Sequence, residues 1–271
     1  MNSNNYKENN TLRNMINKRG QIAIFIIVAV VIVAVVLIIF LFPQVTEVFV
    51  TQDLNPTAFL SKCIEPVILE GIELTSKQGG YLEPDNYVMY QGEKIQYLCY
   101  TSENYKPCVV QQPLIKEKME NELEFFVEPV ARQCVSDLEE EYERRGFNVD
   151  TKPGDVDVKI EPQKIIVDFL SPMTVSKEST QTFRKFAIGI NSEIYDLVLT
   201  ATSIIQFESA LGDSSIEEYI QYYPDLKIEK IKREGDTIYK LSNVITEESF
   251  TFASRSLVWP PGYGFVDLEN E

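Results

Sequence analysis

Four cysteines are the residues of this chain whose chemistry is most readily assigned. They all follow the long apolar run that ends at residue 42, and they are Cys63, Cys99, Cys108 and Cys134. An even number of cysteines in an exported domain favours disulfide bonds. Of the three possible connectivities, we favour the one in which Cys99 pairs with Cys108 and closes a loop. Cys63 then pairs with Cys134 and ties two predicted helices together.

The sequence gives little support to metal or enzyme chemistry. Zinc is the competing interpretation of the cysteines, but there is no CxxC pair and no histidine. The lack of histidine also removes the usual general base of hydrolases, and no GxSxG, SxxK, HExxH, Walker A or GxGxxG motif is present. We therefore predict that the protein is not an enzyme and uses no cofactor. An exported carboxylate-dependent enzyme is an alternative that requires two buried acidic side chains facing each other in a cleft.

Two groups of acidic residues could bind a cation or a basic partner. The first group lies near the end of a predicted helix, just before two arginines, and comprises Asp137, Glu139, Glu140, Glu141 and Glu143. We favour a solvated helix end, because one helical turn spreads adjacent side chains apart. The second group, Asp150, Asp155 and Asp157, lacks the DxDxDG pattern and the terminal glutamate of a calcium loop. We therefore predict no metal site.

Aromatic residues are concentrated between the two predicted cysteine-bearing helices. The six tyrosines there are Tyr81, Tyr87, Tyr90, Tyr97, Tyr100 and Tyr105, and Trp259 follows near the C-terminus. Aromatic-rich exterior loops often form surfaces for a protein or glycan partner. Ordinary packing is the alternative, and we favour it for most of these residues.

Residues 21–43 form a predicted transmembrane helix. Every residue from Ile22 to Phe42 is apolar, and a helix of this length spans about 31 Å, which matches the hydrocarbon core of a bilayer. Residues 22–42 would therefore contact membrane lipid. The run is longer than the apolar part of a secretory signal peptide, and no A-x-A-like site follows it. We expect it to remain as an anchor.

The charge distribution predicts the orientation of this anchor. The first 20 residues carry a net charge of +3, whereas the rest of the chain carries −19. Positive charge directly before the apolar run places the N-terminus in the cytoplasm and the C-terminal domain outside the cell. An exterior this acidic argues against nucleic acid or anionic lipid as partners of the domain.

The segment Lys18-Arg19-Gly20-Gln21, followed directly by the apolar helix, resembles the class III signal peptide of archaeal type IV pilin-like proteins. In that family a membrane aspartic peptidase cuts after the glycine. The resemblance implies that the bond between Gly20 and Gln21 is cleaved and that the apolar helix bundles in a filament or stays in the membrane. Many pilins carry a glutamate at the fifth mature position for subunit registration, but this chain has Phe25.

The order of elements after the anchor is similar to that of uncharacterised archaeal membrane-anchored surface proteins. It comprises a cysteine-bearing helix that ends at Gln78-Gly79-Gly80-Tyr81, a second cysteine-bearing helix and a C-terminal Pro-Pro-Gly-Tyr-Gly. This resemblance implies a place at the cell surface and no particular activity.

We predict an α+β ectodomain of long helices and antiparallel sheet after the transmembrane helix. Apolar residues at helical spacing, with glycine stops, predict helices over 56–77, 113–145 and 192–211. Pro66 and Pro129 should kink or divide the first two. A shorter helix, capped by Asp213 or Ser214, should run to Tyr223.

We divide the chain outside the transmembrane helix into five parts. They are a cytoplasmic leader 1–20, a stalk 44–55, a helical cysteine-bearing part 56–148, an α+β part 149–265 and an acidic tail 266–271.

Alternating apolar residues predict the strands. A hairpin is expected from 86–90 and 95–100, and a meander from 156–160, 165–169 and 182–190. Three further strands, 226–232, 237–243 and 249–257, follow the long C-terminal helix. From these features we predict a single-pass cell-surface protein with a disulfide-stabilised binding or structural ectodomain. A pilin-like filament subunit cleaved after Gly20 is the first alternative, and the exported carboxylate-dependent enzyme is the second.

Overall fold

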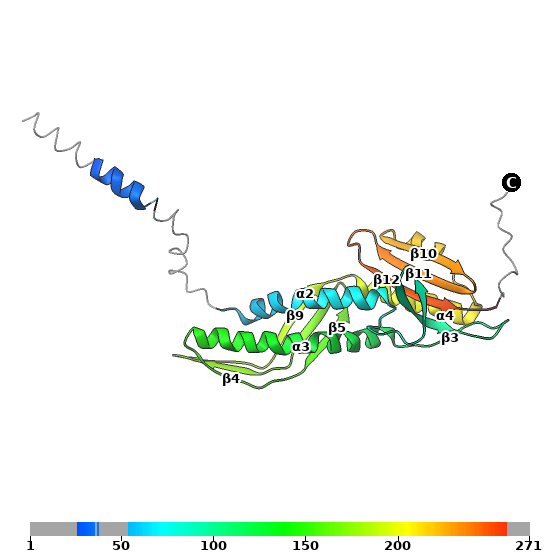
Figure 1. Cartoon of the computed structure of the whole chain (residues 1–271), viewed down its shortest axis with the longest axis horizontal. Helices are drawn as coiled ribbons and strands as arrows, with labels where there is room; N and C mark the ends of the chain where they lie inside the picture. The colour runs from blue at the N-terminus through cyan, green and yellow to red at the C-terminus, as the bar shows by residue number, and fades with distance from the viewer. Residues whose placement is uncertain (1–25, 36, 38–53, 259–271) are drawn as a thin grey trace, which may run out of the picture. The chain divides into compact units, whose positions relative to one another are not determined.

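The computed structural model describes residues 26–35, 37 and 54–258, which fall in two compact units divided after Asp53 (Figure 1). Residues 26–35 and 37 are helical and belong to the predicted membrane segment. Within the described ranges, no helix is both long and apolar enough to cross a membrane. The rest of residues 21–43, the leader, the stalk up to Asp53 and the acidic tail lie outside the described residues. The membrane span therefore stays a prediction.

Two long helices, α2 (Pro56–Lys77) and α3 (Ile115–Arg144), begin the second unit and match the sequence prediction closely. The Asn55 side chain accepts a 3.1 Å hydrogen bond from the Ala58 amide, and Pro56 occupies the first turn, where its missing N–H is no loss. Neither Pro66 nor Pro129 divides its helix. After α2 the chain turns at Gly79 and Gly80, both with positive φ, and the Gly80 amide donates to the Thr75 carbonyl.

The two helices are antiparallel and tightly packed. Their contacts run in opposite directions, since Cys63 is bonded to Cys134 and the backbone of Gly80 meets the Ile115 side chain. Between these points Gly71 faces Phe126, whose ring carbon would come within 2.9 Å of an added Cβ. Both predicted disulfides are present in the structure: Cys63–Cys134 links the helices, and Cys99–Cys108 closes the loop between two strands.

A three-stranded sheet with the order β5–β6–β9 packs its apolar face on the helices. Its strands are β5 (Val156–Glu161), β6 (Lys164–Phe169) and β9 (Phe186–Asn191), and all pairings are antiparallel. Burial alternates along β5 and β9, as expected for a sheet with one packed face. A separate sheet, in the order β4–β7–β8, contains β4 (Asn148–Thr151), β7 (Met173–Ser176) and β8 (Thr180–Phe183).

The predicted single strand 182–190 is wrong, because it is divided between these two sheets. Residues up to Phe183 belong to β8, and residues from Phe186 belong to β9. In one strand, residues three apart face opposite sides. Here the rings of Phe183 and Phe186 lie 5.3 Å apart, which requires a break in the strand between them. The charged residues Arg184 and Lys185 occupy this break.

The largest sheet is mixed and joins the beginning of the domain to its end. Its order is β1–β2–β12–β11–β10, with β3 beside β2, and its bounds are β1 (Tyr87–Tyr90), β2 (Glu93–Tyr100), β3 (Val109–Val110), β10 (Leu226–Arg233), β11 (Asp236–Asn243) and β12 (Ser249–Arg255). The predicted hairpins are present, but β12 and β2 are parallel, so the sheet is not wholly antiparallel. The predicted parts 56–148 and 149–265 contribute residues to one hydrophobic core.

Helix α4 (Ile194–Leu211) covers β12 and ends at Gly212, which has the left-handed φ of 85° that glycine adopts without strain. Helix α5 (Glu217–Tyr222) is shorter than predicted. Its predicted cap is wrong, since Ile216 precedes the first turn and no side chain caps it. The Asp213 carboxylate and the Ser214 backbone carbonyl instead accept hydrogen bonds from Lys230.

The two disulfides should contribute unequally to stability. In the chain-entropy description, cross-linking residues 71 positions apart stabilises the fold by about 4 kcal/mol, against about 2.5 kcal/mol for residues nine positions apart. We expect the variant with Cys63→Ala and Cys134→Ala to lose more free energy of unfolding than the variant with Cys99→Ala and Cys108→Ala. Urea unfolding of both variants measures this difference, and equal losses would contradict the expected order.

Among the glycines that the structure describes, Gly154 should be the least tolerant of a side chain. A Cβ there would lie 1.8 Å from the backbone oxygen of Leu170, and backbone atoms cannot move aside as a flexible side chain can. We expect Gly154→Ala to lower the free energy of unfolding by about 2 kcal/mol or more. Gly189→Ala is the matched control, since nothing lies within 4 Å of its added Cβ. A similar loss in both variants would show that the close approach to Leu170 is not the cause.

Candidate functional site

The residues predicted for processing, Gly20 and Gln21, and the aromatic residue Trp259 lie outside the described residues. The acidic run near the end of α3 is engaged locally. Glu141 pairs with Arg144 and Arg145, and Gln133 donates a 2.7 Å hydrogen bond to Asp137. In the described part of the chain, no group of three or more acidic or cysteine side chains is placed to hold a metal ion.

The second acidic group also forms separate local pairs. Asp155 contacts Arg132 at 3.2 Å, and Asp157 contacts Lys159 at 2.8 Å. The hydrogen bond from Lys159, against a smaller effect of burial, lowers the pKa of Asp157, so this carboxylate is already charge-compensated. The two aspartates therefore pair with different basic residues. They do not form the group of oxygen ligands that calcium requires.

The tyrosines of the loop region have different environments. Tyr97 is buried and packs edge-on against Tyr100 at 5.0 Å, whereas Tyr105 is 73% exposed. The rings of Tyr81 and Tyr87 each lie beneath a lysine ammonium group, from Lys118 and Lys94. Most of this cluster therefore packs within the domain, and Tyr105 has the most exposed ring of the group.

Two carboxylates of α3, one buried and one half-buried, complete the backbone hydrogen bonding of the edge strand β5. Glu120 accepts a 2.7 Å hydrogen bond from the Ile160 amide and also pairs with Lys116 at 2.8 Å. One helical turn later, Glu124 accepts a 3.0 Å hydrogen bond from the Val158 amide. An edge strand has unpaired N–H groups, and leaving such groups buried is costly. The two carboxylates thus have a structural role, which is to accept hydrogen bonds from the edge of β5.

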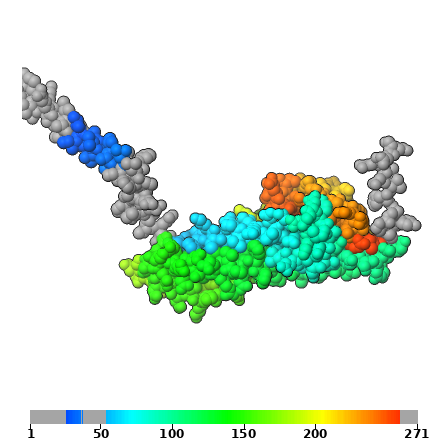
Figure 2. All heavy atoms as spheres, viewed as in Figure 1, coloured from blue at the N-terminus to red at the C-terminus, as the bar shows by residue number. Residues whose placement is uncertain are grey.

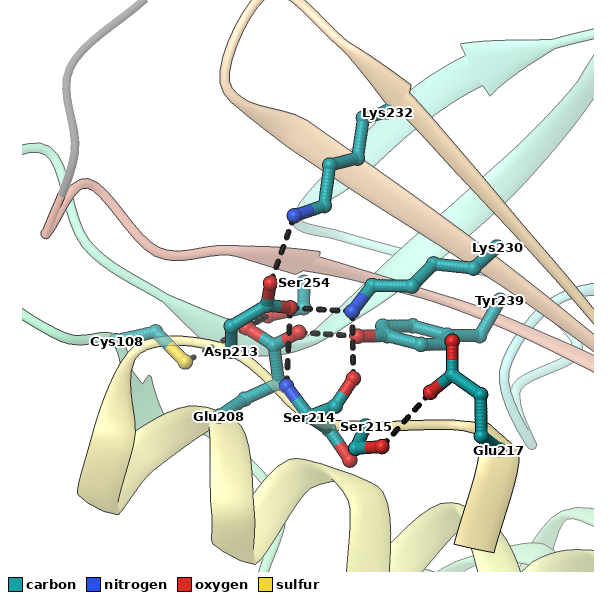
Figure 3. Close-up of polar contacts among 10 residues, drawn as sticks. All are labelled: Cys108, Glu208, Asp213, Ser214, Ser215, Glu217, Lys230, Lys232, Tyr239 and Ser254. Atoms are coloured by element: carbon teal, nitrogen blue, oxygen red, sulfur yellow. Dashed lines mark hydrogen bonds and ion pairs between the residues drawn. The ribbon is translucent and has the colours of Figure 1, made fainter. Parts of the chain in front are cut away.

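Glu208 is the most unusual acidic residue of the structure. It lies on the buried face of α4, is 1% exposed, and binds the hydroxyl groups of Tyr239 on β11 and Ser254 on β12 (Figure 3). The Ser254 hydroxyl also lies 3.6 Å from the sulfur of Cys108, next to the second disulfide. Above the Tyr239 ring, Lys230 binds Asp213 and the Ser214 carbonyl.

The pKa values of Glu208 and Asp213 are shifted in opposite directions. Burial raises the pKa of Glu208, although the hydrogen bond from Tyr239 acts against it. Burial also acts to raise the pKa of Asp213, but hydrogen bonds from Lys230 and Lys232 outweigh it and lower the pKa. Burial and the Glu208 charge raise the pKa of Tyr239, so the phenol stays a hydrogen-bond donor. The cluster can hold a proton at Glu208 to a higher pH than an ordinary glutamate does.

This cluster does not form the facing pair of acids that a carboxylate-dependent enzyme requires. Among the described residues, the buried carboxylates are those of Glu120 and Glu208, and their hydrogen-bond partners are different groups. Neither side chain lines the groove described below. Sequence reasoning overlooked Glu208, although it follows Ile204 by four residues and so lies on the same helical face. The apolar residue just before it, Phe207, is 46% exposed.

A groove of about 360 Å³ lies between the C-terminal half of α2, the start of α4 and the turn between β11 and β12. Figure 2 shows the end of the β11–β12 pair, in orange, beside α2, in cyan. This volume is within the range of ligand sites in proteins. Its apolar side chains are Leu69, Ile72 and Ile194, and its polar ones include Ser76, Lys77 and Glu247. We regard this groove as the candidate binding site of the domain.

Glu248 fixes the two walls of this groove relative to each other. One carboxylate oxygen accepts a 2.6 Å hydrogen bond from the Ser192 hydroxyl, and the other accepts one of 2.6 Å from the Glu193 amide. These donors lie at the start of α4, where a negative charge is stabilised by the helix dipole. The β11–β12 turn is thereby tied to the first turn of α4.

Comparisons of the chain with protein-family models, with curated proteins and with solved structures found no match.

The raised pKa of Glu208 predicts a pH dependence of stability. The folded state holds this proton more tightly than the unfolded state, so its stabilising effect is complete below the unfolded pKa near 4.5 and is lost as the pH rises through the folded pKa. We expect Glu208→Gln to remove this decline, so the free energy of unfolding of the wild type should fall relative to that of the variant as the pH rises above the unfolded value of 4.5.

Asp213→Asn supplies a control of opposite sign when the urea unfolding is extended below the unfolded value of pH 3.8. The folded pKa of Asp213 is lowered, so its contribution is present above the unfolded pKa and is lost as the pH falls through the folded pKa. A Glu208→Gln variant whose stability parallels that of the wild type at every pH would contradict the assignment of the retained proton to Glu208.

Proposed function

We propose that the protein is a single-pass protein of the cell surface, with its N-terminus in the cytoplasm and its disulfide-tied domain, residues 54–258, outside the cell. The two disulfides are the observation that carries this proposal. Such bonds persist in oxidising compartments and are rare in the cytosol. The apolar run of residues 22–42 supplies the anchor, and the charges around it favour this orientation.

The domain acts by binding a protein or glycan partner and not by catalysis. The groove beside α2 supports this function, since it combines an apolar lining with a few polar groups. The buried carboxylates, in contrast, are engaged in holding β5 and α4 in place or in the Glu208 cluster. Proteins that bind at a surface need a rigid scaffold for the site, and the disulfide between α2 and α3 provides one.

The location can be tested by thiol labelling and proteolysis of the full chain in cells that produce it. We expect no cysteine to react with a maleimide under denaturing conditions until a reductant is added, because the described structure has no free cysteine. All four cysteines should react after reduction. Protease added to intact cells should remove the domain while the anchor stays in the membrane fraction. Free thiols before reduction, together with a domain protected from protease, would rule out the surface location.

A pilin-like subunit is the second candidate, and the segment Lys18-Arg19-Gly20-Gln21 is the observation that favours it. It predicts a mature N-terminus at Gln21 by intact mass spectrometry of protein taken from membranes. It also predicts filaments by electron microscopy. Because Phe25 replaces the registration glutamate, we expect no filaments even where cleavage has occurred, and a tether in the membrane instead. Filaments that contain the protein would make the pilin-like assembly the better description.

A further inference from the structure

The groove beside α2 has an excess of negative charge. Lys77 is its basic residue, and this ammonium group is already paired with Glu73 at 2.6 Å. Glu247 and Glu248 also line the groove, and no lysine or arginine of the described residues lies within ion-pair distance of either carboxylate. Glu248 is compensated in part by the donors at the start of α4. Glu247, on the exposed turn, is left as the uncompensated charge.

The lining of the groove also contains an unsatisfied hydrogen-bonding group. Ser76 is 3% exposed, and its hydroxyl has no hydrogen-bond partner among the described residues. Leaving a buried hydroxyl unpaired costs about 1–3 kcal/mol, so native proteins rarely keep one without a reason. Rotation about a single side-chain bond changes the direction of the hydroxyl, and Ser76 lines the groove. The oxygen is inaccessible in its present rotamer, and once turned toward the groove it can accept a hydrogen bond from a ligand that carries donors.

The remaining lining suits an aliphatic chain. Ile72 and Ile194 are buried, and Leu69 is 43% exposed. An arginine side chain combines the required features, because its stem is aliphatic and its planar head carries a charge and five N–H donors. The same head can donate to a carboxylate and to a hydroxyl group at once.

We propose that this groove binds an arginine side chain of a protein partner. The stem packs on Ile72, Ile194 and Leu69, and the guanidinium group pairs with Glu247 and donates to the Ser76 hydroxyl. The inference rests on the proposed function, because it names the partner chemistry for the same site. The net charge of −16 of the chain adds to the attraction, since it favours the approach of a basic partner over that of an acidic one.

The test uses the full chain in detergent micelles and two small probes, acetyl-arginine amide and acetyl-citrulline amide. The probes have nearly the same shape, but citrulline has no charge. Binding is measured by ligand-observed NMR titration. We expect arginine to bind about tenfold more tightly than citrulline, as a charge-assisted contact predicts. Equal binding of the two probes, or no binding of either, would overturn the proposal.

Two variants test the residues that receive the guanidinium group. Glu247→Asn removes the charge and is compatible with the left-handed backbone at this position, where φ is 63°, because asparagine tolerates that region. It should reduce arginine binding to the level of citrulline. Ser76→Ala should weaken arginine binding several-fold, while the melting temperature without ligand stays the same or rises because an unpaired hydroxyl is removed. A fall in melting temperature with unchanged binding would show that Ser76 has only a structural role.

Glu140→Gln is the matched control for Glu247→Asn, because it also removes one negative charge. Glu140 is exposed on α3 and does not line the groove. This variant should bind arginine as the wild type does. If it loses as much arginine affinity as Glu247→Asn, the binding reflects only the general negative charge of the chain. The arginine site and the surface location can be tested independently of each other. If the probes do not bind but protease cleaves the domain from intact cells, the arginine site is wrong and the surface location stands.

Discussion

The antiparallel pairing of α2 with α3 is the constraint on which the rest of the domain depends. Glycine at position 71 lets the helices approach closely, and the bond between Cys63 and Cys134 fixes their register near the beginning of α2. With that register set, α3 lies along β5, and α2 lies against β9 and β12. The two helices therefore support both the sheet β5–β6–β9 and the mixed sheet. A shift between them would disturb the contacts of each.

Two acidic residues of α3, Glu120 and Glu124, have a structural explanation. A three-stranded sheet exposes the N–H groups of an edge strand, and natural proteins cover such edges or block them. Here a helix covers the edge, and its side chains supply the acceptors that a neighbouring strand would have provided. The four-residue spacing of Glu120 and Glu124 places them on one helical face, and the two-residue spacing of Val158 and Ile160 presents amides in the same direction. Carboxylates of this kind cannot be read as catalytic from their burial alone.

The local elements were predictable because each depends on residues that are close in sequence. Asn55, the glycine stop after α2 and the alternation in β5 determine their own segments. The parallel pairing of β12 with β2 depends on residues more than 150 positions apart, so no local pattern predicts it. The break before Phe186 was missed although the sequence marks it. Phe183 lies three residues before Phe186 and is therefore out of phase with the alternating residues Phe186, Ile188 and Ile190.

The candidate site was hidden from the sequence because its residues come from three elements. Ser76 has an ordinary place near the end of a helix, and Glu247 has an ordinary place in a turn. Each becomes informative only when the fold brings both to one groove, where the hydroxyl lacks a partner and the carboxylate lacks a counter-charge. One ligand group that carries both a positive charge and several hydrogen-bond donors satisfies the hydroxyl and the carboxylate together. The shape of the groove admits many ligands of suitable size, and the need to satisfy both residues is what favours a guanidinium group among them.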